Sequence, residues 1–322
     1  MKRIIYLSII FLIYGKQLVA QHAGKMTHQE MIRKVPYLLY LPVAYDTDTA
    51  KRYPLVMFLH GSGESGSDLG KVKRIGLPKI IAQGKQFPFI LISPQAGPTG
   101  WDEEELYHLL QNAKSMYRVD NNRVYLTGVS MGGGGTWELA KKHPEEFAAI
   151  VPICGGRDTL SLYRLRNVPV WAFQGLKDDV APPQRMVEMV NVLKKYNPSV
   201  KLTLYPEANH NSWDTTYQTP ALYTWLLQQK RFRYREVKLE KAQLDRYIGS
   251  YLNGTDTIQV TAENDRLILR WKPYQELVMK PAMDELFFVG QDTPVDLQFI
   301  RQKNRQMFIL TRQTRLLFRQ IN

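Results

Sequence analysis

The sequence predicts an α/β protein, with a doubly wound, mostly parallel sheet followed by a second, smaller antiparallel β domain. Short apolar runs alternate with helical stretches between residues 35 and 229, which is typical of strands covered by helices on both faces. A glycine-rich junction between a strand and a helix lies within this alternation, in the stretch 123–140. After about residue 235, short β-type runs replace the helical pattern.

The predicted strands of the first domain are short and apolar. They cover residues 35–42, 55–59, 89–92, the beginning of 123–140, 147–153, 169–173 and 200–205. The predicted helices cover residues 69–83, 102–117, the end of 123–140, 182–196 and 221–229. In an open sheet of this kind, ligands bind beyond the carboxyl ends of the strands. Four polar residues follow such strand ends: His60, Ser130, Asp178 and His210.

The second domain is predicted to be all β. Its β-type runs are residues 257–260, 267–271, 277–279, 286–289, 297–301, 307–311 and 316–319. Residues 264–265 and 302–305 have the composition of turns. A small antiparallel sandwich and a closed barrel both fit this pattern. The charged stretch 231–243 separates the domains, so we expect the first at residues 21–235 and the second at residues 236–322.

The N-terminus has the features of a signal peptide over residues 1–20. It has a basic start, an apolar run at residues 4–13 and small residues before a cleavage point after Ala20. The apolar run is too short for a comfortable membrane span, and no cysteine follows it as a lipid attachment point. We therefore expect a secreted or periplasmic protein with no integral membrane span after cleavage. An uncleaved N-terminal anchor is the alternative.

Charge and cysteine content narrow the classes of function. The formal net charge is +13, but Lys and Arg are scattered, without a long basic run, so nucleic acid is not an expected partner. The single cysteine, Cys154, excludes an intramolecular disulfide and a cysteine metal cluster, and its apolar surroundings predict a buried structural thiol. The sequence has no P-loop, dinucleotide-binding fingerprint or metal-binding histidine spacing. We expect no cofactor and no metal, and the sequence does not indicate an oligomeric state.

The junction at Ser130 has the pattern of a nucleophilic serine. Gly128 and Gly132 flank it in Gly-Val-Ser-Met-Gly, between a strand and a helix. Glycines permit the sharp, strained turn that exposes such a hydroxyl, and the helix N-terminus favours developing negative charge. By chance this pattern would occur in roughly one chain in ten of this size, so a plain glycine-rich connection is the alternative.

A nucleophilic serine needs a base, and the base needs an orienting acid. The chain has six histidines, and His210 is the one in a loop after a late strand with polar neighbours. Asp178 is the favoured acid because it heads the turn after a predicted strand. Its neighbour Asp179 could instead cap the next helix, and Asp158 and Asp214 are weaker candidates.

The oxyanion that develops during acyl transfer needs hydrogen-bond donors. One candidate is the backbone N–H of Met131, directly after the nucleophile. The other is the backbone N–H of Ser62, in the glycine-containing loop 60–63. A plain turn between a strand and a helix is the alternative for this loop.

Three residues are candidates for binding substrate: Trp101, Trp213 and Gln95. Each lies close in sequence to a predicted strand end or to His210, and aromatic side chains beside a site often bind aromatic or sugar groups. Packing is an equal alternative for both tryptophans.

Residues 37–229 resemble the α/β-hydrolase superfamily. The matching motifs are residues 53–64, 93–95, 128–133, 175–180 and 210–213. The order serine, aspartate, histidine along the chain is also that of the superfamily. Within it, this stretch is most similar to secreted esterases of the feruloyl/acetyl-xylan esterase, polyhydroxybutyrate depolymerase-like and phospholipase/carboxylesterase groups. Residues 244–251 resemble the start of a lipocalin-like β module that follows some serine hydrolase domains.

The resemblance implies an α/β-hydrolase fold and a serine esterase that works through a Ser-His-Asp triad and an acyl-enzyme. The expected substrate is a small ester or an acylated polysaccharide, with acyl or feruloyl groups as the acid part. Two other functions stay open at this point. One is a serine peptidase of the prolyl-oligopeptidase type, which shares the fold and the triad. The other is a non-catalytic protein whose β domain binds glycan or cell wall.

Overall fold

The computed structural model describes residues 26–29, 35–254, 256–272, 276–290, 295–301, 305–310 and 315–321. The predicted signal peptide at residues 1–20 lies outside the described residues. Within them, none of the helices combines the length and the hydrophobicity that crossing a bilayer requires.

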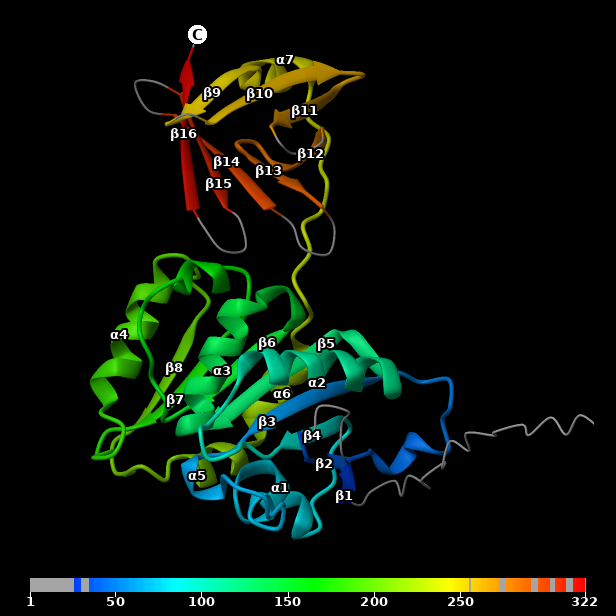
Figure 1. The fold of residues 1–322 in the computed structure, drawn as a ribbon, viewed down its shortest axis with the longest axis vertical. Helices are drawn as coiled ribbons and strands as arrows, with labels where there is room; N and C mark the ends of the chain where they lie inside the picture. Colours follow the sequence, from blue (N-terminus) through cyan, green and yellow to red (C-terminus); the bar gives the residue numbers. More distant parts are fainter. Residues whose placement is uncertain are drawn as a thin grey trace, which may run out of the picture.

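The first domain is built on an eight-stranded sheet with the strand order β1-β2-β4-β3-β5-β6-β7-β8 (Figure 1). Its strands are β1 (Met26–Gln29), β2 (Tyr37–Tyr40), β3 (Tyr53–Leu59), β4 (Ile90–Pro94), β5 (Val119–Val129), β6 (Ala149–Ile153), β7 (Trp171–Gly175) and β8 (Lys201–Tyr205). Its helices are α1 (Gly76–Ala82), α2 (Glu103–Met116), α3 (Met131–Lys142), α4 (Pro183–Lys194), α5 (Trp213–Gln218) and α6 (Pro220–Gln228). The pairs among β3 to β8 are parallel, whereas β2 pairs antiparallel with β1 and β4. The predicted mostly parallel sheet is confirmed.

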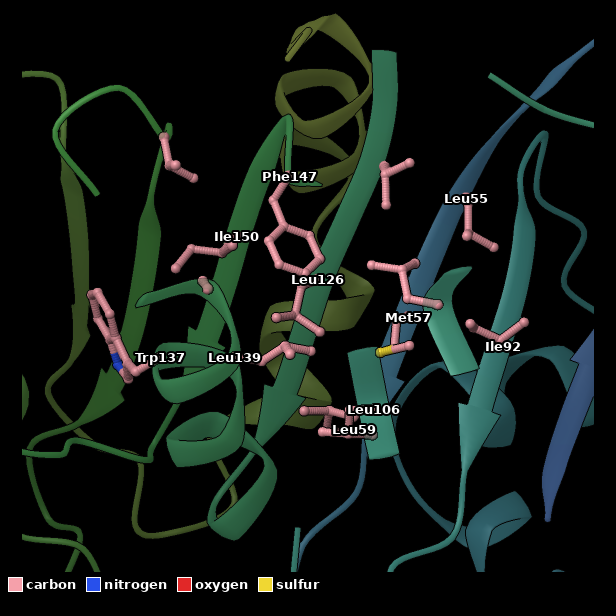
Figure 2. Packing of buried hydrophobic residues seen from close by; sticks show 14 of the residues in the cluster. Leu55, Met57, Leu59, Ile92, Leu106, Leu126, Trp137, Leu139, Phe147 and Ile150 are labelled. Carbon is pink, nitrogen blue, oxygen red and sulfur yellow. The ribbon is translucent and has the colours of Figure 1, made fainter. Parts of the chain in front are cut away.

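Helices cover both faces of this sheet, and strand β3 shows why its sequence is a continuous apolar run. All seven of its residues are buried. Leu55, Met57 and Leu59 pack into one core with residues of α2, α3 and α4 (Figure 2). Val56 and Phe58 point to the opposite face and pack with residues of α1, α5 and α6. A strand buried on both faces needs an apolar side chain at nearly every position.

The structure also has elements that the sequence pattern did not predict, among them β1 and α5. The helix predicted at residues 69–83 is shorter, because α1 begins at Gly76 after a 3-10 turn at Val72–Arg74. Gly76 has a φ of +56°, and a Cβ there would lie 2.4 Å from the ring of Phe58. The sharp turn at this glycine therefore prevents one continuous helix.

The second domain is a closed antiparallel barrel with the strand order β10-β11-β12-β13-β14-β15-β16-β9 (Figure 1). Its strands are β9 (Gly249–Asn253), β10 (Asp256–Glu263), β11 (Arg266–Trp271), β12 (Leu277–Met283), β13 (Leu286–Val289), β14 (Val295–Arg301), β15 (Arg305–Leu310) and β16 (Arg315–Ile321). The short helix α7 (Lys241–Leu244) precedes them. Strand β9, which was not among the predicted β-type runs, closes the barrel by pairing with both β10 and β16. The predicted smaller antiparallel β domain is confirmed, and of the two architectures considered it has that of a barrel.

Apolar side chains fill the part of the barrel that the structure describes. Tyr251, Phe287 and Phe318 are each 0% exposed. The ring of Phe299 lies 4.5 Å from the ring of Tyr247 and 5.6 Å from that of Phe287. Inward-facing aromatic and aliphatic side chains of this size leave a packed core where larger barrels have a ligand cavity.

A buried ion pair joins the two domains. Arg166, between β6 and β7, donates from Nε to Asp296 Oδ2 on β14 over 2.6 Å, and Asp296 is only 1% exposed. Beside this pair, the side chain of Asn167 donates to the hydroxyl of Tyr234, whose ring stacks on Phe288 at 5.2 Å. Arg166 and Asn167 precede β7, so the barrel contacts the first domain at the amino-terminal side of its sheet (Figure 1).

The ion pair between Arg166 and Asp296 yields a prediction about stability. We expect Arg166→Met to destabilise the protein by up to about 3–5 kcal/mol, because it leaves a buried carboxylate without its partner. Thermal and chemical unfolding of the variant and the wild type measure this loss. The matched control is Arg246→Met, which breaks the more exposed ion pair with Asp284 and should cost less. Equal losses in the two variants would contradict the prediction.

Candidate active site

Ser130 occupies the sharp turn between β5 and α3. Its φ is 54° and its ψ is −117°, a conformation that a residue with a side chain rarely adopts. The turn is held on both sides, since the Ser130 N–H donates to the Ile153 carbonyl and the Gly134 N–H donates to the Ser130 carbonyl, each over 3.0 Å. This strand–turn–helix geometry projects the serine hydroxyl beyond the carboxyl end of β5.

The positions two residues before and after Ser130 must be glycine, because a side chain there would clash with neighbouring backbone. A Cβ on Gly128 would lie 2.3 Å from the carbonyl oxygen of Gly132. A Cβ on Gly132 would lie 2.1 Å from the carbonyl oxygen of Leu59. The end of β3, the end of β5 and the first turn of α3 can therefore pack together only because these positions carry no side chain.

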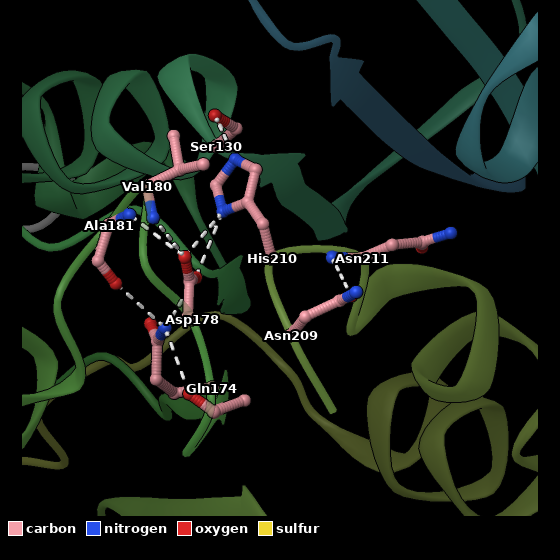
Figure 3. A network of polar contacts seen from close by, with 9 residues as sticks. Ser130, Gln174, Asp178, Val180, Ala181, Asn209, His210 and Asn211 are labelled. Carbon is pink, nitrogen blue, oxygen red and sulfur yellow. Dashed lines mark hydrogen bonds and ion pairs between the residues drawn. The ribbon is translucent and has the colours of Figure 1, made fainter. Parts of the chain in front are cut away.

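His210 lies between Ser130 and Asp178 (Figure 3). Its Nε2 is 2.9 Å from Ser130 Oγ, and its Nδ1 is 2.9 Å from Asp178 Oδ2 and 3.0 Å from Oδ1. A carboxylate accepts hydrogen bonds, so Nδ1 carries the ring proton and Nε2 is left to accept the serine proton. The loop between β8 and α5 holds this ring in place, because the Ser212 N–H donates to the His210 carbonyl over 2.9 Å.

Asp178 is fixed by a set of donors at the end of β7 (Figure 3). Its Oδ1 accepts from the backbone N–H groups of Val180 and Ala181, at 3.0 and 2.8 Å. Its Oδ2 accepts from Gln174 Nε2 over 2.7 Å. The residue is 5% exposed, so these bonds hold the carboxylate toward His210 out of contact with water.

The other aspartates that the sequence suggested lie elsewhere. Asp179, next to Asp178, is exposed. Asp158 forms an ion pair with Lys141, and Asp214 forms one with Lys79. Among the four candidates, the structure brings Asp178 to the histidine.

The loop after β3 lies beside Ser130. The Cβ position of Gly61 would be 3.6 Å from Ser130 Cβ, and Ser62 is the next residue. Met131 is the first residue of α3, so its N–H has no partner within the helix. In the part of the chain that the structure describes, the backbone N–H groups of Ser62 and Met131 donate to no protein group. Two backbone donors are thus available in the segments that adjoin Ser130.

Trp213 and Trp101 take different places around the site. The ring of Trp213 meets that of His210 edge-on, with centroids 5.4 Å apart. Trp101 packs against His60, with ring centroids 4.6 Å apart, and its Nε1 donates to the His60 carbonyl over 3.3 Å. Trp213 therefore borders the catalytic histidine candidate, whereas Trp101 supports the loop after β3. Binding of substrate by either ring stays a prediction.

Gln95 is 3% exposed, and its side chain is occupied by the loop after β3. Its Nε2 donates to the carbonyl of Glu64 over 2.7 Å and to that of Asp68 over 2.8 Å. These bonds identify Gln95 as a support of the loop. A contact with substrate, as predicted from the sequence, would require the buried amide to be uncovered.

The sequence analysis placed His60 at a strand end but gave it no role. It is 0% exposed, and burial lowers its pKa to about 4, opposed by a hydrogen bond to the Gly61 carbonyl. The Nδ1 atom lies 2.6 Å from the Gly61 oxygen, and the Ala96 N–H donates to Nε2 over 3.0 Å. The only sequence signal was its place at a strand end before a glycine.

Cys154, Asp178 and His210 bring one ligand atom each within 4.8 Å of one another. Asp178 and His210 are already bonded to each other, and a metal-binding cysteine must lose its proton. Burial raises the pKa of the Cys154 thiol to about 12, and the residue is 0% exposed, as predicted for a structural thiol. The group therefore fits proton transfer better than metal binding.

Comparison with known proteins shows which proteins this chain resembles. Residues 102–222 match the sequence profile of the dienelactone hydrolase family. The larger domain has the α/β-hydrolase fold. The chain is also similar to a solved structure titled as a thermostable esterase, with a TM-score of 0.56 and 28% identity over 64% of this chain and 63% of that one. A solved ferulic acid esterase shares the fold, with a TM-score of 0.50 and 20% identity over 63% of this chain and 96% of that one.

Two curated relatives are similar in sequence to this chain. The bifunctional acetylxylan esterase/xylanase XynS20E of Neocallimastix patriciarum is 27% identical over 201 residues, which are 60% of this chain and 29% of that protein. Probable feruloyl esterase C of Aspergillus terreus is 25% identical over 169 residues, which are 50% of this chain and 61% of that protein. The match thus spans less than two thirds of the length of each of these relatives.

The lowered pKa of His60 predicts a pH dependence of stability. The unfolded chain takes up a proton at His60 near pH 6.5, whereas the folded protein does so only near pH 4. Folding should therefore lose stability as the pH falls through this window, by roughly 3 kcal/mol in total from this group. Denaturant unfolding at a series of pH values measures it. His60→Asn should flatten the curve, whereas the control His108→Asn, at an exposed position, should keep the wild-type slope.

Proposed function

We propose that this protein is a secreted serine hydrolase that cleaves carboxylic esters through a Ser130–His210–Asp178 triad. The observation that carries the proposal is the continuous hydrogen-bonded chain from Ser130 Oγ through His210 to the buried carboxylate of Asp178. The two free backbone N–H groups beside the serine support the same chemistry. The names of the relatives and of the similar structures point to ester substrates.

The geometry gives each residue one role. His210 Nε2 takes the proton from Ser130 Oγ as the oxygen attacks the ester carbonyl. Asp178 stabilises the imidazolium that forms and holds the ring in its reactive tautomer. The N–H groups of Met131 and Ser62 donate to the oxyanion of the tetrahedral intermediate.

Collapse of the intermediate expels the alcohol, which leaves with the proton held by His210, and the acyl group stays on Ser130. Water then enters, and His210 takes its proton as the oxygen attacks the acyl carbon. A second tetrahedral intermediate collapses to release the carboxylic acid and returns the proton to Ser130.

We propose acyl or feruloyl esters on polysaccharide as the substrate class. Acetylxylan and feruloyl esterase activities appear in the names of the two curated relatives. Trp213 beside His210 supplies an aromatic surface at the site, which suits a cinnamoyl or sugar ring. Secretion, proposed from the N-terminal sequence, would place the protein where such polymers occur.

Substitutions in the triad test the mechanism. We expect Ser130→Ala and His210→Ala each to lower kcat by roughly 10⁵- to 10⁶-fold, and Asp178→Asn to lower it by roughly 10⁴-fold. Hydrolysis of p-nitrophenyl acetate by the purified proteins measures these losses. Asp179→Asn is the matched control and should stay within about twofold of the wild type, because Asp179 is exposed. Retained activity in the Ser130 or His210 variant would rule out the triad.

An ester panel tests the substrate class. We expect the wild type to hydrolyse p-nitrophenyl acetate and methyl ferulate faster than longer-chain esters and far faster than peptide p-nitroanilides. Faster cleavage of peptide amides would instead identify a serine peptidase. A protein that hydrolyses none of these, and is not labelled by a fluorophosphonate, would be a non-catalytic binding protein. The Ser130→Ala variant gives the background rate in every assay.

A further inference from the structure

His60 is the second histidine of the site, and it lies under the loop that carries the Ser62 N–H. The Ala96 N–H can only donate, so His60 Nε2 must accept from it. The ring proton of the neutral imidazole is therefore on Nδ1 and points to the Gly61 carbonyl oxygen, 2.6 Å away. The ring joins the end of β4 to the loop after β3 in one tautomer.

The bond to Gly61 determines the direction of the next amide. In a trans peptide unit the C=O and the N–H lie in one plane and point in opposite directions. The carbonyl of Gly61 and the N–H of Ser62 belong to the same peptide unit. Holding the Gly61 oxygen toward His60 therefore turns the Ser62 N–H to the opposite side of the loop. The Glu64 N–H also donates to the Gly61 oxygen, but over 3.4 Å, so the shorter bond from His60 is the stronger restraint.

The residues around His60 pack against its ring, and no carboxylate among the described residues forms a hydrogen bond with it. Trp101 packs on the ring, and a Cβ on Gly135 of α3 would lie 3.0 Å from Trp101, so that helix backs the tryptophan. The carboxyl group of Glu64, in the same loop, lies beside Gly61, and burial raises its pKa. In the part of the chain that the structure describes, the His60 ring bonds only to backbone groups. His60 thus lacks the carboxylate that His210 uses.

We propose that His60 is a positioning residue of the oxyanion hole, whose Nδ1–H orients the Gly61–Ser62 peptide so that the Ser62 N–H faces the reacting carbonyl. This inference rests on the proposed function. The bond matters most in the transition state, because the oxyanion needs a donor already aimed at it. His60 acts through Ser62 and takes no proton from the substrate.

Two near-isosteric substitutions separate the two bonds of the ring. Asparagine places its amide nitrogen near the position of Nδ1, so His60→Asn keeps a donor for the Gly61 carbonyl. Glutamine places its amide oxygen near the position of Nε2, so His60→Gln keeps an acceptor for the Ala96 N–H and loses the donor. We expect the asparagine variant to stay within about threefold of wild-type kcat, and the glutamine variant to lose roughly 10- to 100-fold with KM nearly unchanged.

The measurements are kcat and KM on p-nitrophenyl acetate, with unfolding temperatures of both variants as the structural control. If both variants lose kcat in proportion to the fall in their unfolding temperatures, His60 only stabilises the loop. Equal kcat values, or a weaker asparagine variant, would overturn the positioning role while leaving the triad intact. Absence of wild-type activity on every ester would instead refute the proposed function.

A measurement on the wild type covers the case in which a variant does not fold. Nitrogen NMR of the protein labelled with ¹⁵N-histidine should show, besides His210, a second histidine with a protonated Nδ1 and an unprotonated Nε2 throughout the neutral range. Its signal is assigned to His60 by its absence in His60→Asn or, failing that, by its coupling to the Ala96 amide. A protonated Nε2 would overturn the proposal, because the ring could then not donate to the Gly61 carbonyl.

Discussion

The site depends on three segments of backbone that approach one another more closely than side chains would allow. A Cβ on Gly132 would meet the Leu59 carbonyl at 2.1 Å, and one on Gly155 would meet the Ser130 carbonyl at 2.2 Å. Because these glycines have no side chains, the end of β3, the turn at Ser130 and the end of β6 can pack directly against one another. The strained conformation of Ser130 persists because its neighbours hold it from both sides. The strand ends thus bring together Ser130, the histidine that bonds to it and the proposed oxyanion donors.

The two histidines of the site, His60 and His210, differ in the groups that bond to their ring nitrogens, and this difference suits them to different roles. His210 has a buried carboxylate on one nitrogen and the serine hydroxyl on the other, which suits a group that gains and loses a proton. His60 has a carbonyl on one nitrogen and an amide N–H on the other, and burial holds its pKa near 4. A ring that stays neutral in one tautomer is suited to fixing a backbone in place. The same side chain is therefore suited to proton transfer at His210 and to positioning at His60, the two roles proposed above.

The place where the barrel contacts the first domain and its filled interior both separate it from the candidate active site. The ion pair between Arg166 and Asp296 joins it to the amino-terminal side of the sheet, whereas Ser130 and His210 follow carboxyl ends. Its described interior is filled with side chains such as Phe287 and Phe318. Both features favour a stabilising or docking role for the barrel over direct contact with the ester at Ser130.

The sequence by itself determined the class of fold and the nucleophile candidate, because both depend on local patterns. Continuous apolar runs such as residues 55–59 indicate strands buried on both faces, and the glycines around Ser130 indicate a strand–turn–helix junction. Only the tertiary structure decided between Asp178 and Asp179, since adjacent residues of one turn differ in burial and direction, not in pattern. It alone revealed the role proposed for His60, whose partner Ala96 lies 36 residues away. It also decided that the second domain closes into a barrel, because closure requires hydrogen bonds between β9 and β16, at opposite ends of that domain.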